Sequence, residues 1–258
     1  MNQAHQNQLN QNFQLKKNKF MQTKRKLNFI LCSKGGVGKS MLTTLFALVK
    51  ENDEHSVFID LDNATQTSTK QLKFLGKNRT ETISLLNEKE VLVRDNLISY
   101  LESLVTSPFN EFFFDLGSPE SEQIPALLDR DIPFKEFLDE LGFEAHFHVV
   151  VGGGGAYKPC IEYLQKILKS LHGQFDITVW KNITSFNNFQ ALSYELKQIC
   201  HDLAIRFRQF GDFDPSSHLG NQILDGIRLG NGFNDYQTGA RLRIKKELNE
   251  NFSYELGA

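Results

Sequence analysis

One short segment limits the folds open to this chain more than any other. Residues 34–40 read Lys-Gly-Gly-Val-Gly-Lys-Ser. An apolar run at residues 27–32 precedes the segment, and residues 41–50 follow it with the apolar spacing of a helix. The order is therefore strand, glycine-rich loop and helix. A loop in this position can point successive backbone N–H groups at a phosphate chain, and the positive end of the helix dipole adds to the attraction.

The side chains of this loop complete a site for a nucleotide and its metal ion. Lys39 can reach the terminal phosphates, and the Ser40 hydroxyl can ligate Mg²⁺. Ser33 stands where the general phosphate-loop motif has its first glycine, so the match to that motif is incomplete. The residues expected to bind ATP are Gly35, Gly36, Val37, Gly38, Lys39, Ser40 and Met41.

Two further apolar runs end in carboxylates. Residues 56–59 are followed by Asp60 and Asp62, and residues 111–114 are followed by Asp115. Because the carboxyl ends of parallel strands meet at one edge of a sheet, these acids are expected to lie near the glycine-rich loop.

The rest of the chain repeats the alternation of strands and helices. Residues 147–151 and 175–181 read as further buried strands, and helical patterns lie between the strands. These helical patterns cover residues 95–105, 123–130, 134–141 and 158–171. The alternation predicts an α/β fold of the P-loop NTPase type, with a mainly parallel twisted sheet and helices on both faces.

Each acid has an expected role, because phosphoryl transfer needs a phosphate cradle, a cation and a group that positions water. Asp115 ends a strand of three phenylalanines and is expected to serve Mg²⁺, since a buried carboxylate is costly unless a cation is near. Asp62 is expected to orient the attacking water, with helix capping as its structural alternative. Asp60 is either a residue of the metal site or a purely structural carboxylate.

The loop carries a family resemblance. Residues 34–40 match the KGGVGK[ST] signature at every position, so the chain resembles the deviant Walker A ATPases of the ParA/MinD type over about residues 27–182. The resemblance implies that Lys34 reaches across an ATP sandwich dimer to the phosphates of the partner subunit, so that hydrolysis depends on dimerisation. It gives Asp62 and Asp115 the same roles as above, and it implies an adenine contact for Asn182.

The chain also departs from that family. Met41 stands where many relatives have a hydroxyl residue that contacts the α-phosphate, and residues 63–64 read Asn-Ala instead of the usual Pro-Gln of the first switch loop. The bulky residue after Ser40, the turn at residues 115–118 and the late strand bearing Trp180 look similar to TraL/StbB-type ATPases of plasmid transfer and stability regions.

The two ends of the chain differ from its middle. Residues 1–26 are rich in Asn and Gln and then basic, which predicts a disordered arm that is either a solvated tail or a hook for DNA or anionic lipid. Residues 27–258 are expected to form a single domain. Within it, residues 240–248 read as an amphipathic helix that packs on the domain or, alternatively, contacts a membrane or DNA.

Composition narrows the class of protein. A formal net charge of −2 provides no global positive field to gather nucleic acid. No stretch has the length of a membrane span and the first residues lack a secretory pattern, so a cytoplasmic protein is expected. The widely spaced Cys32, Cys160 and Cys200 fit neither a disulfide framework nor a CxxC site and are expected to be buried thiols.

Two weaker patterns each have a structural interpretation. The four glycines at residues 152–155 are expected to form a flexible turn near the nucleotide rather than a dinucleotide motif. His146 and His148 are expected to face the same side of a strand as ordinary sheet residues, with a metal site as the less favoured alternative because no third ligand is visible.

The expected function is that of a slow, partner-stimulated, Mg²⁺-dependent ATPase. Its ATP-dependent homodimer would position, partition or mobilise DNA or a DNA-bound adaptor protein, as in plasmid segregation or conjugation, with a membrane as a secondary partner. Two alternatives stay open: an ATP-dependent small-molecule ligase or synthetase on the same fold, and a nucleotide-binding scaffold with little hydrolysis.

Overall fold

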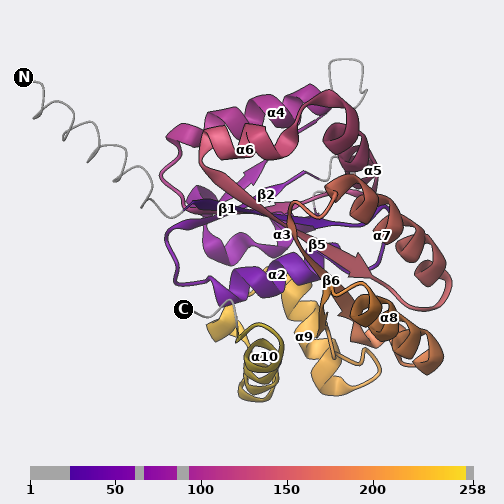
Figure 1. The fold of residues 1–258 in the computed structure, drawn as a ribbon. Helices are drawn as coiled ribbons and strands as arrows, with labels where there is room; N and C mark the ends of the chain where they lie inside the picture. The colour runs from indigo at the N-terminus through magenta and orange to yellow at the C-terminus, as the bar shows by residue number, and fades with distance from the viewer. Residues whose placement is uncertain (1–23, 62–66, 86–92, 254–258) are drawn as a thin grey trace, which may run out of the picture.

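Seven parallel strands form one sheet in the computed structural model, which describes residues 24–61, 67–85 and 93–253. The strand order is β3-β2-β4-β1-β5-β6-β7, so β1 lies at the centre of the sheet (Figure 1). The strands are β1 (Arg25–Leu31), β2 (Ser56–Asp60), β3 (Thr80–Thr82), β4 (Glu111–Asp115), β5 (Phe143–Val151), β6 (Asp176–Asn182) and β7 (Arg206–Phe210). This architecture confirms the predicted α/β class with a parallel sheet.

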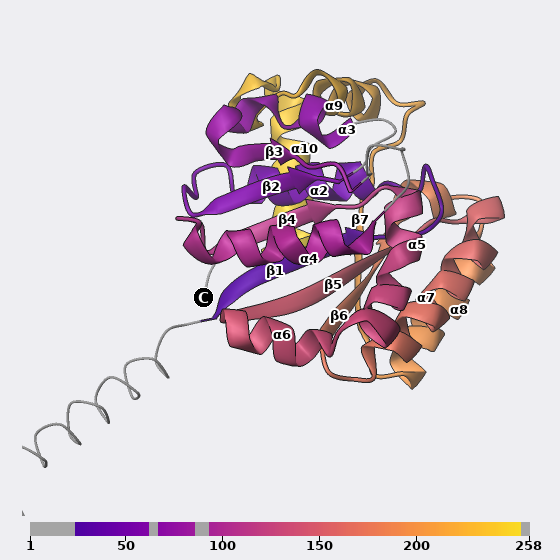
Figure 2. The same cartoon turned by 90° about the horizontal axis from the view of Figure 1, so that it is seen from above.

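Helices cover both faces of the sheet. In Figures 1 and 2, α4, α5 and α6 lie on one side, and α2, α9 and α10 lie on the other. The helices are α2 (Lys39–Val49), α3 (Thr67–Gln71), α4 (Arg94–Ser103), α5 (Ser118–Ala126), α6 (Phe134–Leu141), α7 (Tyr157–Leu171), α8 (Gln190–Asp202), α9 (His218–Leu229) and α10 (Thr238–Asn251). None of the helices within the described ranges has both the length and the apolarity that crossing a bilayer requires.

The first strand begins earlier than its sequence indicates. β1 starts at Arg25, so Arg25 and Lys26 belong to the sheet and not to the predicted arm of residues 1–26. The Arg25 guanidinium donates hydrogen bonds to the carbonyl groups of Leu104, Val105 and Ser107 and lies 4.5 Å from the ring centre of Phe143. These contacts stabilise the charged Arg25 within the strand. A prediction that rests on runs of apolar residues does not include such a residue.

Several elements lie outside the sequence prediction. The short β3 and the elements α8, β7 and α9 have no predicted counterpart, and β5 begins at Phe143 instead of residue 147. The strand β7 reads Arg-Phe-Arg-Gln-Phe, in which polar residues interrupt the apolar ones. It is recognisable as a strand only because it pairs in parallel with β6.

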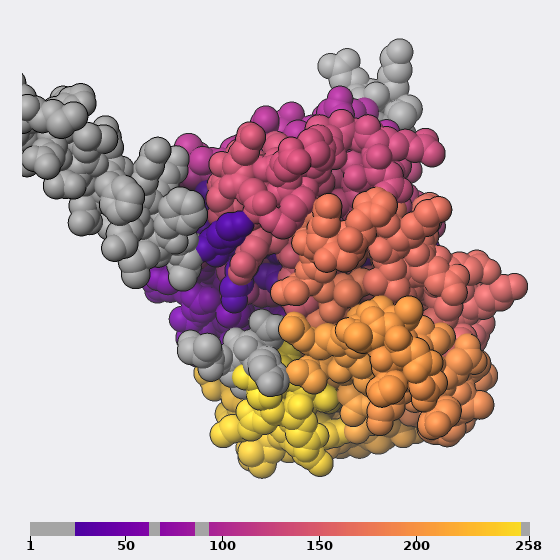
Figure 3. All heavy atoms as spheres, in the orientation of Figure 1, coloured from indigo at the N-terminus to yellow at the C-terminus, as the bar shows by residue number. Residues whose placement is uncertain are grey.

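The predicted C-terminal helix packs on the domain. Ala240 and Ile244 of α10 are fully buried, and Phe252, which follows the helix, stacks on Trp180 with ring centres 4.9 Å apart. In the space-filling view, the yellow α10 lies directly against orange segments of the C-terminal half (Figure 3). The packed alternative for this helix is therefore the one that the structure supports.

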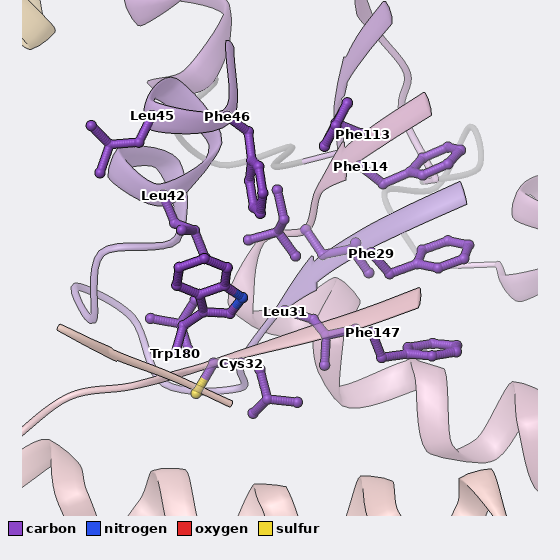
Figure 4. Packing of buried hydrophobic residues seen from close by; sticks show 14 of the residues in the cluster. Phe29, Leu31, Cys32, Leu42, Leu45, Phe46, Phe113, Phe114, Phe147 and Trp180 are labelled. Carbon is purple, nitrogen blue, oxygen red and sulfur yellow. The ribbon is translucent and has the colours of Figure 1, made fainter. Parts of the chain in front are cut away.

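Aromatic side chains fill both layers between sheet and helices. On one face, Phe29 stacks between Phe114 and Phe147, with ring centres 4.8 and 5.2 Å away. On the other face, Phe46 of α2 contacts Phe113 and Trp180. Figure 4 shows these two groups pointing away from opposite sides of the strands. The sheet is therefore anchored on both faces close to the strand that leads into the glycine-rich loop.

Candidate nucleotide-binding site

The glycine-rich loop lies between β1 and α2 at the carboxyl edge of the sheet. β1 has β4 and β5 as neighbours, so the ends of these two strands flank the loop. Gly36 and Gly38 adopt φ angles of 74° and 105°, which side chains disfavour. A Cβ atom on Gly38 would lie 2.7 Å from Nδ2 of Asn182. The loop conformation therefore depends on these two glycines.

The ammonium group of Lys39 lies beneath the loop. Its Nζ donates hydrogen bonds to the carbonyl oxygen of Cys32 at 3.1 Å and to Oγ of Ser118 at 3.1 Å. A longer contact of 3.5 Å joins Nζ to the carbonyl oxygen of Lys34. The cation is thus placed inside the loop, where an incoming phosphate can exchange with these neutral acceptors.

Asp115 ends β4 beside the start of α2. Its carboxylate is buried and accepts a hydrogen bond from Ser68. Burial raises the pKa of Asp115 to about 6, the hydrogen bonds from Ser68 and Ser40 lower it, and the neighbouring Asp60 charge raises it. Its Oδ1 atom is buried without a hydrogen-bond partner among the described residues. The Asp115 carboxylate and the Ser40 hydroxyl together offer oxygen ligands of the kind that a hard divalent cation prefers.

Asp60 ends β2 and is tied to the next helix. Its Oδ2 accepts hydrogen bonds from the backbone N–H and the hydroxyl of Thr69, both at 2.9 Å. Thr69 belongs to α3, so the Asp60 carboxylate stabilises the first turn of that helix. These contacts favour the structural alternative for Asp60, and its partner in the strand register is Asp115.

Of the two remaining predicted catalytic residues, Lys34 and Asp62, the structure describes only Lys34. Lys34 is exposed near the start of the loop, and its predicted contact with a partner subunit stays a prediction. Asp62 lies outside the described residues, so its predicted role in orienting water stays a prediction. The neighbouring residues 63–64 of the first switch loop also lie outside them.

Asn182 and Met41 line the side of the loop that faces β7. Nδ2 of Asn182 donates a hydrogen bond of 2.9 Å to the carbonyl oxygen of Val37 within the loop, while its buried Oδ1 has no partner among the described residues. Met41 packs against Gly211, where an added Cβ atom would come within 2.6 Å of the methionine methyl group. Asn182 therefore supports the loop directly, and Met41 fills space with an apolar side chain where a hydroxyl would offer a hydrogen bond.

Two hydroxyl residues of this site have no predicted role. Ser118 at the start of α5 accepts from Lys39, and Ser68 of α3 donates to Asp115. The sequence does contain a signal for Ser118, because it follows the strand-ending Asp115 by three residues and directly precedes a proline. Ser68 has no such signal, since it reaches Asp115 across 47 residues.

The two histidines of β5 form part of a hydrogen-bond chain. His148 Nδ1 accepts from Trp180 Nε1 at 3.0 Å, and its Nε2 lies 3.2 Å from Oδ1 of Asn28. The ring of His146 lies 4.1 Å from that of His148, and burial lowers the pKa of His146 to about 4. The rings do face the same side, as predicted. Both have hydrogen-bond partners within the sheet, and no cluster of three or more metal-ligating side chains occurs among the described residues.

The glycines at residues 152–155 support the loop from the β5 side. A Cβ atom on Gly152 would lie 3.2 Å from Val37, and one on Gly153 would lie 2.3 Å from the carbonyl oxygen of Ser185. The run therefore allows close packing of backbone against the glycine-rich loop. The predicted position of this turn near the nucleotide edge agrees with these contacts.

A separate cavity of about 500 Å³ lies at the opposite, amino edge of the sheet. Its lining includes Lys26, Glu144 and Arg206, together with Lys135 of α6. It shares no residue with the glycine-rich loop. The chemistry of this cavity is mixed in charge, whereas the loop concentrates phosphate-binding groups, so the loop is the stronger candidate site.

The residues present fit a Mg²⁺-nucleotide. The loop backbone and Lys39 would hold the phosphates, while Ser40 and Asp115 would hold the cation directly or through water. The unpaired Oδ1 of Asp115 is the observation that tests this fit, because a buried carboxylate oxygen without a donor is stabilised by a bound cation.

The strand order and the loop together define a P-loop NTPase fold. No protein-family model matches the chain, and no curated protein matches its sequence. Among solved structures, the chain is similar to the MinC:MinD cell division protein complex of Aquifex aeolicus, with a TM-score of 0.53 and 11% identity over 87% of this chain and 96% of the other. It is similar to the MinD cell division protein of Aquifex aeolicus with the same TM-score and 14% identity, over 87% of this chain and 95% of the other. The fold is thus that of MinD-like proteins.

Proposed function

We propose that this protein is a Mg²⁺-dependent ATPase that uses ATP to switch between a monomer and a homodimer. The observation that carries the proposal is the buried carboxylate of Asp115, which interacts with Ser40 at the start of α2 and has one oxygen without a hydrogen-bond partner among the described residues. Lys39 beneath the loop supplies the phosphate contact, and the exposed Lys34 is free to act on a second subunit. Asp62 would orient the attacking water.

The output of the switch is proposed by analogy with proteins of this fold. The similar Aquifex protein is a MinD that forms a complex with MinC. By the same logic, the dimer of this protein would recruit a DNA-bound adaptor or DNA itself, in plasmid segregation, stability or conjugative mobilisation in the cytoplasm. Turnover would be slow and would rise when the partner binds.

Analytical ultracentrifugation of Asp62→Ala tests the switch. With Mg²⁺-ATP this variant is expected to sediment as a dimer, because blocked water attack traps the sandwich, and with Mg²⁺-ADP it is expected to stay monomeric. The double variant with Lys34→Ala should remain monomeric in both nucleotides. A mass that never responds to nucleotide would rule out the dimer switch.

One observation favours a second function, that of a nucleotide-binding scaffold with little hydrolysis. Met41 packs on Gly211 and offers no hydroxyl to the α-phosphate. A scaffold would bind ATP tightly, and its rate of hydrolysis would stay negligible with DNA and with candidate partners. The Met41→Thr variant separates the two functions. If the protein is a scaffold, its hydrolysis rate is near zero and the substitution should raise it, whereas an ATPase switch already hydrolyses ATP with Met41 in place.

A further inference from the structure

Two cysteines that are far apart in the sequence meet beneath the glycine-rich loop. Cys32 directly follows β1, and Cys160 lies in α7. Their sulfur atoms are 3.6 Å apart, and both side chains are fully buried. Both are buried thiols, as predicted, but their contact could not be predicted because 128 residues separate the two positions.

The two sulfur atoms are not equivalent. Cys32 donates its thiol hydrogen to Cys160 and itself accepts a hydrogen bond from the backbone N–H of Lys34 at 3.5 Å. The hydrogen bond from Cys32 lowers the pKa of Cys160, and the Gly152 N–H and the charges of Lys39 and Lys34 lower it further, against the effect of burial. The same hydrogen bond and burial raise the pKa of Cys32. Cys160 is therefore the thiol of the pair that loses its proton more readily.

The pair is linked to the phosphate-binding lysine. The carbonyl oxygen of Cys32 accepts the hydrogen bond from Lys39 Nζ, and the loop begins at the next residue. A disulfide brings two sulfur atoms to about 2 Å, so forming one would draw Cys32 and Cys160 together by roughly 1.5 Å. A phosphate cradle works only when its donors keep their positions to within about 0.5 Å.

We propose that Cys32 and Cys160 form a reversible disulfide under a small peroxide oxidant, and that this bond reshapes the glycine-rich loop and weakens nucleotide binding. The second part rests on the proposed function, whereas the first part does not. In the first step, the Cys160 thiolate attacks one oxygen of the peroxide, which forms a sulfenic acid and releases hydroxide. In the second step, the Cys32 thiol displaces water from that sulfenic acid, and the S–S bond forms. The two sulfur atoms lose two electrons to the peroxide O–O bond. The proton lost by Cys160 combines with the released hydroxide and the proton of Cys32 leaves in the displaced water, so two water molecules form.

The route to the pair that we expect runs through the loop. Lys34, Gly35 and Gly36 are exposed, and they follow Cys32 within four residues along the chain. Local opening of this segment would admit a molecule as small as hydrogen peroxide. A nucleotide bound in the loop should close this route, so Mg²⁺-ATP is expected to slow the oxidation.

The protein contains its own control. Cys200 is also fully buried, but burial alone acts on its thiol and raises its pKa to about 11. Among the described residues, no other sulfur atom pairs with Cys200, and no cation contributes to the shift of its pKa. Cys200→Ser should therefore leave the oxidation unchanged, while Cys160→Ser should abolish the cross-link.

Mass spectrometry of the full chain treated with hydrogen peroxide tests the first part. The expected result is a loss of two hydrogens, a Cys32–Cys160 linked peptide, a fall from three free thiols to one, and complete reversal by dithiothreitol. A sulfinic acid on Cys160, a cross-link between two chains, or no loss of thiols would overturn the proposal. Hydrogen exchange should change at residues 33–40 in the oxidised wild type and stay unchanged in peroxide-treated Cys160→Ser.

Nucleotide titration tests the second part. Oxidised wild type should bind Mg²⁺-ATP at least about tenfold more weakly than the reduced protein, and dithiothreitol should restore the affinity. Equal affinities of the oxidised and reduced forms would overturn the link to the loop. If the reduced protein binds no nucleotide but the linked peptide forms and exchange changes at residues 33–40, the proposed function fails and the disulfide stands. Thermal unfolding of each variant confirms that it is folded.

Discussion

Asp60 and Asp115 lie directly opposite each other at the ends of the paired strands β2 and β4. The two carboxylates share the edge of the sheet that carries the glycine-rich loop, and the Asp60 charge is one cause of the raised pKa of Asp115. Asp60 has donors from Thr69, whereas Asp115 keeps one oxygen unpaired. Neighbouring acids of the same type therefore have different environments, and only Asp115 combines burial with an open coordination position.

The pH dependence of stability should report on Asp115. Because its pKa is raised to about 6, the native state holds this proton more tightly than the unfolded chain does. Its contribution to the free energy of unfolding is complete below the unfolded pKa near 4 and is lost as the pH rises through 6. Between pH 5 and pH 7.5 without nucleotide, wild type should lose on the order of 1 kcal/mol relative to Asp115→Asn.

Urea denaturation at several pH values measures this difference. Asp139→Asn is the control, because Lys135 and Lys24 lower the pKa of that exposed carboxyl and its titration lies below the tested window. Parallel pH profiles for wild type and Asp115→Asn would contradict the assignment.

The two lysines of the loop should have separable effects. Lys39→Ala should weaken ATP binding about tenfold or more, since a hydrogen bond to a charged group contributes about 1.5–3 kcal/mol. Lys34→Ala should leave the dissociation constant of the monomer nearly unchanged but lower the hydrolysis rate by roughly tenfold or more, because its proposed contact forms only in the dimer. Fluorescent-nucleotide titration and phosphate release measure the two quantities. Equal losses of binding in both variants would place Lys34 in its own subunit's site.

Two glycine substitutions should differ in severity. Gly36→Ala meets no atom within 4 Å and should cost about 1–2 kcal/mol through its left-handed backbone alone. Gly38→Ala has the same backbone problem, and its Cβ would also collide with the Asn182 amide that holds the Val37 carbonyl. We expect a loss on the order of 3 kcal/mol for Gly38→Ala, and a larger loss of nucleotide affinity than for Gly36→Ala. Chemical denaturation compares the two variants, and the reverse order would show that the loop adapts around Asn182.

Packing of α10 can be tested with two residues of the same helix. Ile244 is fully buried, so Ile244→Ala should lower the free energy of unfolding by about 2–5 kcal/mol. Leu242 is 60% exposed, so Leu242→Ala should change it by less than about 0.5 kcal/mol. Similar small effects of both substitutions in urea denaturation would mean that α10 detaches from the domain in solution.

Much of the site could be predicted from local sequence. The glycine-rich loop follows the apolar run of β1 almost directly, and Asp60 and Asp115 close the apolar runs of β2 and β4. Local conformation and the parallel arrangement of strands suffice to bring such residues to one edge. The exact bounds of β1 and β5 could not be predicted in this way, because Arg25 and His146 occupy strand positions through partners elsewhere in the chain.

The sequence by itself thus determined the P-loop, the class of fold and the acids that face the loop, because each depends on residue type and short spacing. Tertiary structure alone decided that β4 lies between β1 and β2, that Ser68 donates to Asp115 and that Cys32 meets Cys160. These contacts join residues 47 to 128 positions apart. Their partners are selected by the order in which strands pair and helices pack, and no local pattern in the chain encodes that order.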